Sequence, residues 1–128
     1  IQIIAAILGA LFANYIFGLN VIEISSNIRS GANIYISEIF AATGLLLVIL
    51  LSRADGKNVV SFNVGIYITA ALIFTSSTSF ANPAVTIARI FTESFTGINP
   101  STVVFFISCQ VIGMFAAYIL YNQFFKSK

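Results

Sequence analysis

The sequence predicts an all-α membrane protein in which four transmembrane helices accompany one re-entrant half-helix. Three observations lead to this fold class. The 128 residues are 59% apolar and 8% charged, whereas soluble domains carry roughly 25% charged residues. The apolar residues fall into four long runs, and polar or charged segments separate these runs. A short helix, headed by an Asn-Pro pair, follows a polar stretch between the third and fourth runs.

Composition also excludes several classes of protein. The net charge is only +2, and the chain has no basic cluster with interleaved aromatic residues, so we expect no nucleic-acid partner. With one cysteine and no histidine, the chain can hold no disulfide framework, no Cys/His zinc site and no histidine-based triad. It has no nucleophile beside a base either. We therefore expect no enzyme, no metal and no cofactor.

The beginning of the chain suggests a part of a longer protein, since Ile1 lies inside an apolar run and is not an initiator methionine. Gln2 and Gln110 each begin a run of branched apolar residues followed by small ones, a weak repeat of the kind found in duplicated transport folds. Asn82 lies 28 residues before Gln110. The same interval before Gln2 falls ahead of Ile1, so we expect a partner half-helix to precede this sequence.

The first two predicted transmembrane helices cover residues 1–17 and 33–52, and residues 18–32 form a polar loop between them. The second helix contains one acid, Glu38, and an ionisable group in such a segment usually has a function. We predict that Glu38 accepts hydrogen bonds from backbone N–H groups of residues 75–81, which supports the pore wall. The alternative places it near a helix end, at the headgroups. Small residues that allow close helix packing are Ala5, Gly9 and Ala13 in the first helix and Ala41, Ala42 and Gly44 in the second.

The third and fourth predicted transmembrane helices cover residues 59–74 and 102–124, after a charged turn over residues 53–58 and a break at residues 97–100. Four full spans put both chain ends on one side of the membrane. Most of the cations then share that side, so the positive-inside rule makes it cytoplasmic, with the C-terminus there. The cations on that side are Arg53, Lys57, Lys126 and Lys128, and those opposite are Arg29 and Arg89.

A half-helix is predicted over residues 83–92, because Asn82 is a good N-cap and Pro83 suits the first helical position. Its length of roughly 15 Å is about half of the hydrocarbon core. The hydroxyl run over residues 75–79 must then be covered by protein or line a wet cavity. The helix dipole and the Asn82 amide favour water or a neutral hydroxylated solute there and oppose cations. The alternative is a cap on an ordinary helix.

With these motifs the chain resembles the aquaporin and aquaglyceroporin family, also called major intrinsic proteins. The resemblance covers essentially residues 1–128, as a partial channel domain with the last four of the family's six spans and its second half-helix. It implies a right-handed bundle with one pore per subunit, homotetramers at full length, and a place in the inner membrane of a bacterium. The half-helix region is most similar to bacterial members associated with metalloid handling. The residues that carry the resemblance are the Asn82-Pro83-Ala84 motif, Glu38, Gln110 and Gly113.

The resemblance also implies a selectivity filter, and this chain departs from the usual one at three positions. The residue after the Asn-Pro-Ala motif is usually arginine, but here it is Val85. The other two filter positions within this chain are Ala70 and Ser79. Together these three residues imply a wide filter without a fixed charge.

Arg89 lies one helical turn after Val85, and helical side chains lean toward the N-terminus. We therefore consider that Arg89 supplies the missing filter charge. The alternative is a weak surface pair with Glu93, four residues further on.

These features predict a passive channel for small neutral solutes, namely water, glycerol-like polyols or undissociated metalloid acids such as arsenite. Two alternatives stay open. One is a non-conducting membrane protein, truncated or degenerate, whose helices only assemble with partners. The other is an ion-coupled secondary transporter with a broken helix, which needs intramembrane groups that change charge, and only Glu38 qualifies.

Overall fold

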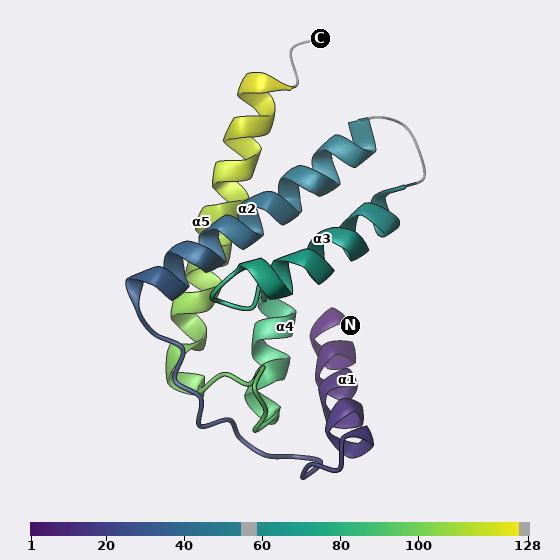
Figure 1. Cartoon of the computed structure of the whole chain (residues 1–128), viewed down its shortest axis with the longest axis vertical. Coiled ribbons are helices and arrows are strands. Elements are labelled where there is room, and N and C mark those ends of the chain that lie inside the picture. The colour runs from purple at the N-terminus through teal and green to yellow at the C-terminus, as the bar shows by residue number, and fades with distance from the viewer. Residues whose placement is uncertain (55–58, 126–128) are drawn as a thin grey trace.

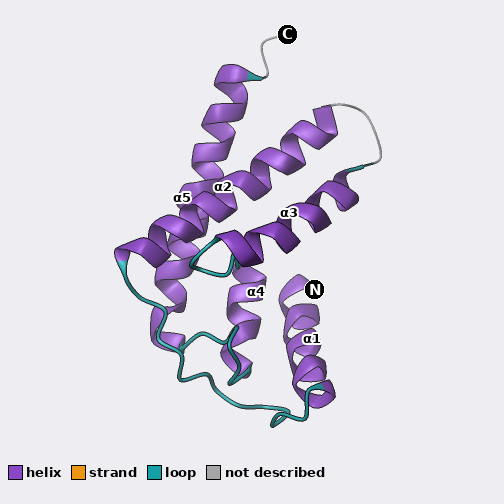
Figure 2. Cartoon of the chain, viewed as in Figure 1, coloured by secondary structure: helices purple, strands orange, loops and turns teal. Residues whose placement is uncertain are grey.

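The computed structural model describes residues 1–54 and 59–125, and within these ranges it contains helices and loops but no strand (Figures 1 and 2). The all-α prediction is therefore confirmed for this part of the chain. The charged turn over residues 53–58 lies partly outside the described residues, and Lys57, Lys126 and Lys128 lie wholly outside them. The elements are α1 (Gln2–Ile16), α2 (Ala32–Ala54), α3 (Val60–Phe74), α4 (Pro83–Ala88), the 3-10 turn η1 (Arg89–Phe91) and α5 (Pro100–Phe124).

Two of the described helices, α2 with 23 residues and α5 with 25, are long and apolar enough to cross a membrane. The helices α1 and α3 are also apolar, but each has 15 residues. A helix of that length extends about 22 Å, which is less than the ~30 Å hydrocarbon core. The four-span count therefore stays a prediction.

The most extensive contact between helices is the crossing of α2 and α5, and Gly113 lies at this crossing. A Cβ atom at Gly113 would lie 2.5 Å from the Ile39 carbonyl oxygen and 2.9 Å from the Ala42 Cβ. The Thr43 hydroxyl donates to the Gly113 carbonyl at 3.1 Å, so a hydrogen bond also joins the two helices. Small residues thus let the two backbones meet, as small residues do within membranes.

The helices α2 and α3 meet at a second glycine, Gly44, which lies under the Tyr67 ring. The Tyr67 hydroxyl donates to the Ala41 carbonyl of α2 at 2.9 Å. The small residues expected to form a packing face on α2 therefore do contact other helices.

The packing face of α1 differs from the one we expected. Ala5, Gly9 and Ala13 are exposed in this chain, and a Cβ atom at Gly9 would meet nothing within 4 Å. The neighbouring face, which carries Ala6, Ala10 and Asn14, lies on α4 and η1, and Asn14 is 2% exposed. Asn14 donates its amide to the Phe91 carbonyl at 2.9 Å, and the need to pair this buried amide turns its face inward.

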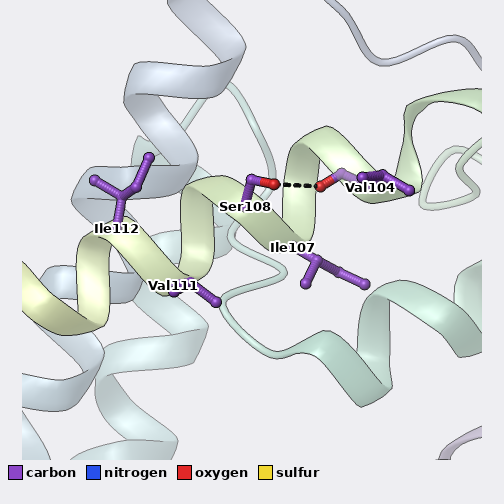
Figure 3. A pocket seen from close by; sticks show the side chains of 5 residues that line it. All are labelled: Val104, Ile107, Ser108, Val111 and Ile112. Carbon is purple, nitrogen blue, oxygen red and sulfur yellow. Dashed lines mark hydrogen bonds between the residues drawn. The ribbon is translucent and has the colours of Figure 1, made fainter.

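The outer surface of the described helices is strongly apolar, as large exposed side chains such as Phe12, Phe40, Phe62 and Phe115 show. On α5 this surface includes a shallow groove of about 420 Å³ (Figure 3). Its single polar side chain, Ser108, donates to the carbonyl of Val104 in the same helix. The groove is therefore an apolar feature of the outer face of α5. It is lined by Val104, Ile107, Ser108, Val111 and Ile112.

Candidate functional site

Glu38 holds the segment between α3 and α4 from inside the protein. Its side chain is completely buried, and its carboxylate accepts the N–H groups of Ala81 at 2.6 Å and Phe80 at 3.2 Å. These are the backbone contacts that the sequence led us to expect of Glu38. The sequence did not predict the contribution of Gln110, whose amide donates to the same carboxylate at 2.7 Å and to the Thr86 hydroxyl at 2.8 Å.

The hydroxyl side chains pair further N–H groups of this segment. The Ser77 N–H donates to the Ser37 hydroxyl at 3.3 Å, and the Ser79 N–H donates to the Ser77 hydroxyl at 3.2 Å. Thr78, Ser79 and Ala81 all have positive φ, at 60°, 44° and 47°. Such a conformation costs a non-glycine residue about 1–3 kcal/mol, so the hydrogen bonds to Glu38 and the serines hold a strained backbone in place.

The carbonyl oxygens of the same segment are left free. Those of Thr78, Ser79, Phe80 and Ala81 accept no hydrogen bond from any residue in the described ranges. The buried hydroxyls of Thr78 and Ser79 also lack a partner there. Because unpaired polar groups are costly inside a protein or a bilayer, this row of oxygens needs water or a solute.

Asn82 caps the short helix α4 as the sequence predicted. Its side-chain oxygen accepts the Ala84 N–H at 2.8 Å, and Pro83 is the first residue of α4. The amide N–H groups of Asn82 donate to no described residue, and Asn82 and Pro83 border a hollow of about 260 Å³ with apolar residues such as Leu45 and Met114. The helix is shorter than expected, because α4 ends at Ala88 and continues as the η1 turn.

Val85 and Arg89 border a different hollow, also of about 260 Å³, between α1 and α4. The guanidinium carbon of Arg89 lies 4.2 Å from the centre of the Phe80 ring, and its Nη1 is buried without a partner among the described residues. Glu93 does not pair with it. The Glu93 carboxylate accepts the hydroxyl and the N–H of Ser26 instead, at 2.6 and 2.5 Å, and these hydrogen bonds lower the pKa of Glu93.

The three expected filter residues do not border one common space. Ala70 is exposed on α3 and lines a third hollow together with Ile66, whereas Val85 lines the hollow at Arg89. Ser79 is buried, at 3% exposed. Val85 and Arg89 thus share one hollow, Asn82 and Pro83 border a second, and Ala70 borders a third.

Arg29, in the loop between α1 and α2, belongs to this region although the sequence analysis gave it no part in the site. It donates to the carbonyls of Gly97 at 2.8 Å, Phe95 at 2.6 Å and Ser77 at 3.3 Å. Its guanidinium carbon also lies 4.9 Å from the centre of the Phe80 ring. Burial lowers the pKa of Arg29, and the charge of Glu38 partly opposes this shift. No local pattern indicates these contacts, since the hydrogen-bond partners lie 48 to 68 residues away in the sequence.

Further backbone contacts join residues 17–31 to residues 92–99, which we call the loop pair. The Asn99 N–H donates to the Asn27 carbonyl at 2.8 Å, and the Asn27 amide donates to the Ser94 carbonyl at 2.7 Å. A Cβ atom at Gly97 would overlap the Ser25 hydroxyl. The loop pair therefore covers η1 at the end of α4.

Comparisons with known proteins give one clear relative. No protein-family model matches this chain, and no solved structure matches it. The chain is 44% identical over 88 residues to Aquaglyceroporin AqpS from Rhizobium meliloti (strain 1021). This stretch is 69% of the chain but 38% of that relative, so the match spans less than half of the relative's length.

Proposed function

Because the matched part of this chain belongs to the aquaporin and aquaglyceroporin family, we propose that the protein forms a passive membrane channel for small neutral solutes. The observation that carries the proposal is the polarity of the segment before the half-helix. Its N–H groups are held by Glu38 and by serine hydroxyls, while consecutive carbonyl oxygens from Thr78 to Ala81 have no described donor. Free carbonyls in a row are the kind of lining that replaces part of a solute's hydration shell.

In the proposed mechanism, a solute exchanges some of its water for these carbonyls and for the Asn82 amide. The apolar side chain of Val85 keeps each contact weak enough to break, as conduction requires. The positive end of the half-helix opposes cations at the same level. Glu38 stays outside the lumen, because its oxygens are occupied by the backbone and by Gln110.

We propose the solute class from the side chains at the three filter positions, Ala70, Ser79 and Val85, with Arg89 as the source of the charge, although Ala70 and Val85 border separate hollows in the described chain. Small side chains at these positions favour a path wide enough for glycerol-like polyols and undissociated metalloid acids such as arsenite, as well as water. The name of the relative, an aquaglyceroporin, supports a path of polyol size. The shared hollow of Val85 and Arg89 supports Arg89 as the nearby cation.

We also propose the setting in which the channel works. The apolar outer surface and the bacterial relative support an integral protein of the inner membrane of a bacterium. By resemblance to the family, full-length subunits assemble as homotetramers, and by the positive-inside rule the C-terminus is cytoplasmic.

The experiment that tests this function compares water and glycerol. The full-length protein is reconstituted in liposomes, and stopped-flow light scattering follows the vesicles after an osmotic step. We expect both solutes to equilibrate faster than in empty liposomes, with glycerol well above background. Folded protein that is no more permeable than empty liposomes would overturn the proposal and favour a non-conducting membrane protein. Uptake that requires a proton gradient and is lost in Glu38→Gln would favour the coupled transporter.

A further inference from the structure

We infer that Arg29 is a specificity-determining residue of this channel, which together with Arg89 holds positive charge at Phe80 and excludes cations. The inference rests on the proposed function, and it assigns part of the charge selectivity to a loop far from the half-helix in sequence. The family pattern gives the charge to the residue that follows Ala84, and here that residue is the uncharged Val85.

Two guanidinium groups meet at one aromatic ring. The guanidinium carbon of Arg89 lies 4.2 Å from the centre of the Phe80 ring, and that of Arg29 lies 4.9 Å from it. Cations within about 6 Å of a ring centre are attracted by the negative charge on its face. The ring is itself fixed, because Phe80 is 2% exposed, packs against Phe106 and donates its N–H to Glu38. Phe80 therefore holds both charges beside the free carbonyls.

Neither cation is neutralised by a paired carboxylate in the described part of the chain. Arg29 donates to three carbonyl oxygens, and Arg89 leaves Nη1 unpaired. Glu93, four residues after Arg89, is occupied by Ser26. Glu38 attracts the charges of both Arg29 and Arg89, but its carboxylate accepts hydrogen bonds from Phe80, Ala81 and Gln110 and from neither guanidinium. Two cations near one carboxylate leave a net positive charge, and the two cations lie close enough to repel each other and any cation that approaches.

Arg29 also contacts the segment directly. Its Nη1 donates to the Ser77 carbonyl at 3.3 Å, while Nε and Nη2 are held by Gly97 and Phe95 of the loop pair. These contacts fix the Arg29 charge at the carbonyl of Ser77, the residue that precedes the free carbonyls of Thr78 and Ser79. A solute on this path meets the charge of Arg29 as well as that of Arg89.

The test compares guanidinium with urea, because the two solutes have nearly the same size and shape but differ by one charge. The full-length protein is reconstituted in liposomes, and the permeability to each solute is measured, with potassium and valinomycin to carry the counter-current. We expect a low ratio of guanidinium to urea permeability in the wild type. Arg29→Gln and Arg89→Gln should each raise this ratio about tenfold, the effect of removing one charge at close range.

Three further variants separate charge from structure. Arg29→Lys keeps the charge but not the fork of hydrogen bonds, so its ratio should stay at the wild-type value. Arg53→Gln removes an exposed cation at the other end of α2 and should also leave the ratio unchanged. Arg29→His should give a low ratio at about pH 5.5 and a high one at about pH 8, within a single folded protein.

The outcomes are distinct. An unchanged ratio in Arg29→Gln with normal urea permeability, or an Arg29→Lys ratio as high as that of Arg29→Gln, would overturn the inference while leaving the channel in place. A ratio for Arg29→His that does not vary with pH would also overturn it. A wild type that passes neither water nor glycerol overturns the channel itself, and the inference with it.

Discussion

Glu38 shows how hydrogen bonds can surround a carboxylate that is buried in an apolar helix. A buried charge is very costly unless hydrogen bonds surround it, and Glu38 accepts three, from Phe80, Ala81 and Gln110. Each donor needs Glu38 in turn, because the two backbone groups belong to a strained segment that has no regular hydrogen-bond ladder. The carboxylate and the segment therefore stabilise each other.

We predict that Glu38→Ala lowers the free energy of unfolding by about 3 kcal/mol or more, since each buried donor left unpaired costs about 1–3 kcal/mol. Glu38→Gln should cost less, because it keeps one acceptor oxygen. The measurement is denaturant unfolding of the full-length protein in detergent. Ser108→Ala is the matched control, as its hydroxyl is exposed and bonds only within α5. Equal stability of Glu38→Ala and Ser108→Ala would contradict this account.

The contacts of a residue could be predicted from the sequence where leaving its polar group buried and unpaired would be costly. An acid in an apolar run must find donors, and the irregular segment must find acceptors, so the contact of Glu38 could be inferred from the sequence. Arg29 lies in a polar loop, where an unpaired arginine costs nothing, and its carbonyl partners have no sequence signature. The alternative pairing of Arg89 with Glu93 is wrong, because Glu93 accepts hydrogen bonds from Ser26, far away in sequence, and the Arg89 guanidinium lies over the Phe80 ring.

At the scale of elements, the crossing of α2 and α5 brings Glu38 and Gln110 together. Glu38 lies on α2 and Gln110 on α5, and Gly113 lets the two backbones meet one turn after Gln110. A larger residue at the crossing would separate the carboxylate from the amide. The packing of α2 on α5 is therefore coupled to the hydrogen bonds that Glu38 accepts from Gln110 and from the segment before α4.

We predict opposite effects of the same substitution at two glycines. Gly113→Ala should lower the thermal unfolding midpoint in detergent, because the new methyl group would lie 2.5 Å from the Ile39 carbonyl and overpacking costs about 1–3 kcal/mol. Gly9→Ala meets nothing within 4 Å and gains helix propensity, so it should leave the midpoint unchanged or raise it. A shift in the same direction for both variants would refute the crossing as described.

Helix positions could be predicted well, but not the face that each helix presents. Apolar runs, the Asn-Pro caps and the glycine break mark where helices begin and end. The sequence did not indicate which face of α1 packs on α4, because its small residues, Ala5, Gly9 and Ala13, suggested a contact face on packing grounds alone. The buried position of Asn14 decides the orientation of α1, since its amide must be paired with hydrogen-bond acceptors.

At the scale of the whole molecule, the described chain has two different ends. The loop pair lies at one end, and the last turns of α2 and α5 lie at the other, with the start of α3 beside α2 (Figure 1). Composition predicted the membrane class, because a chain with 8% charged residues has too few polar side chains to cover a soluble domain. It could not predict how the helices are arranged, because lipid-facing and protein-facing surfaces are equally apolar.

This arrangement makes a prediction about topology that depends on α4. If α4 and η1 enter the membrane and return on the same side, the loop pair faces the periplasm and the C-terminus the cytoplasm. Alkaline phosphatase, which is active only in the periplasm, should then be inactive when fused to the C-terminus and active when inserted after Ile22, an exposed residue of the first loop. Green fluorescent protein fused to the C-terminus should fluoresce, because it folds in the cytoplasm.

The alternative outcome is equally specific. If α4 crossed the membrane fully, the C-terminus would lie on the same side as the residues after Ile22, and phosphatase would be active at both positions. A helix of six residues with a short 3-10 turn extends only about 15 Å, and the loop pair is joined by hydrogen bonds that hold residues 92–99 on the side of residues 17–31. We therefore expect activity only after Ile22, with α4 as a half-helix whose Asn82 end lies inside the bilayer.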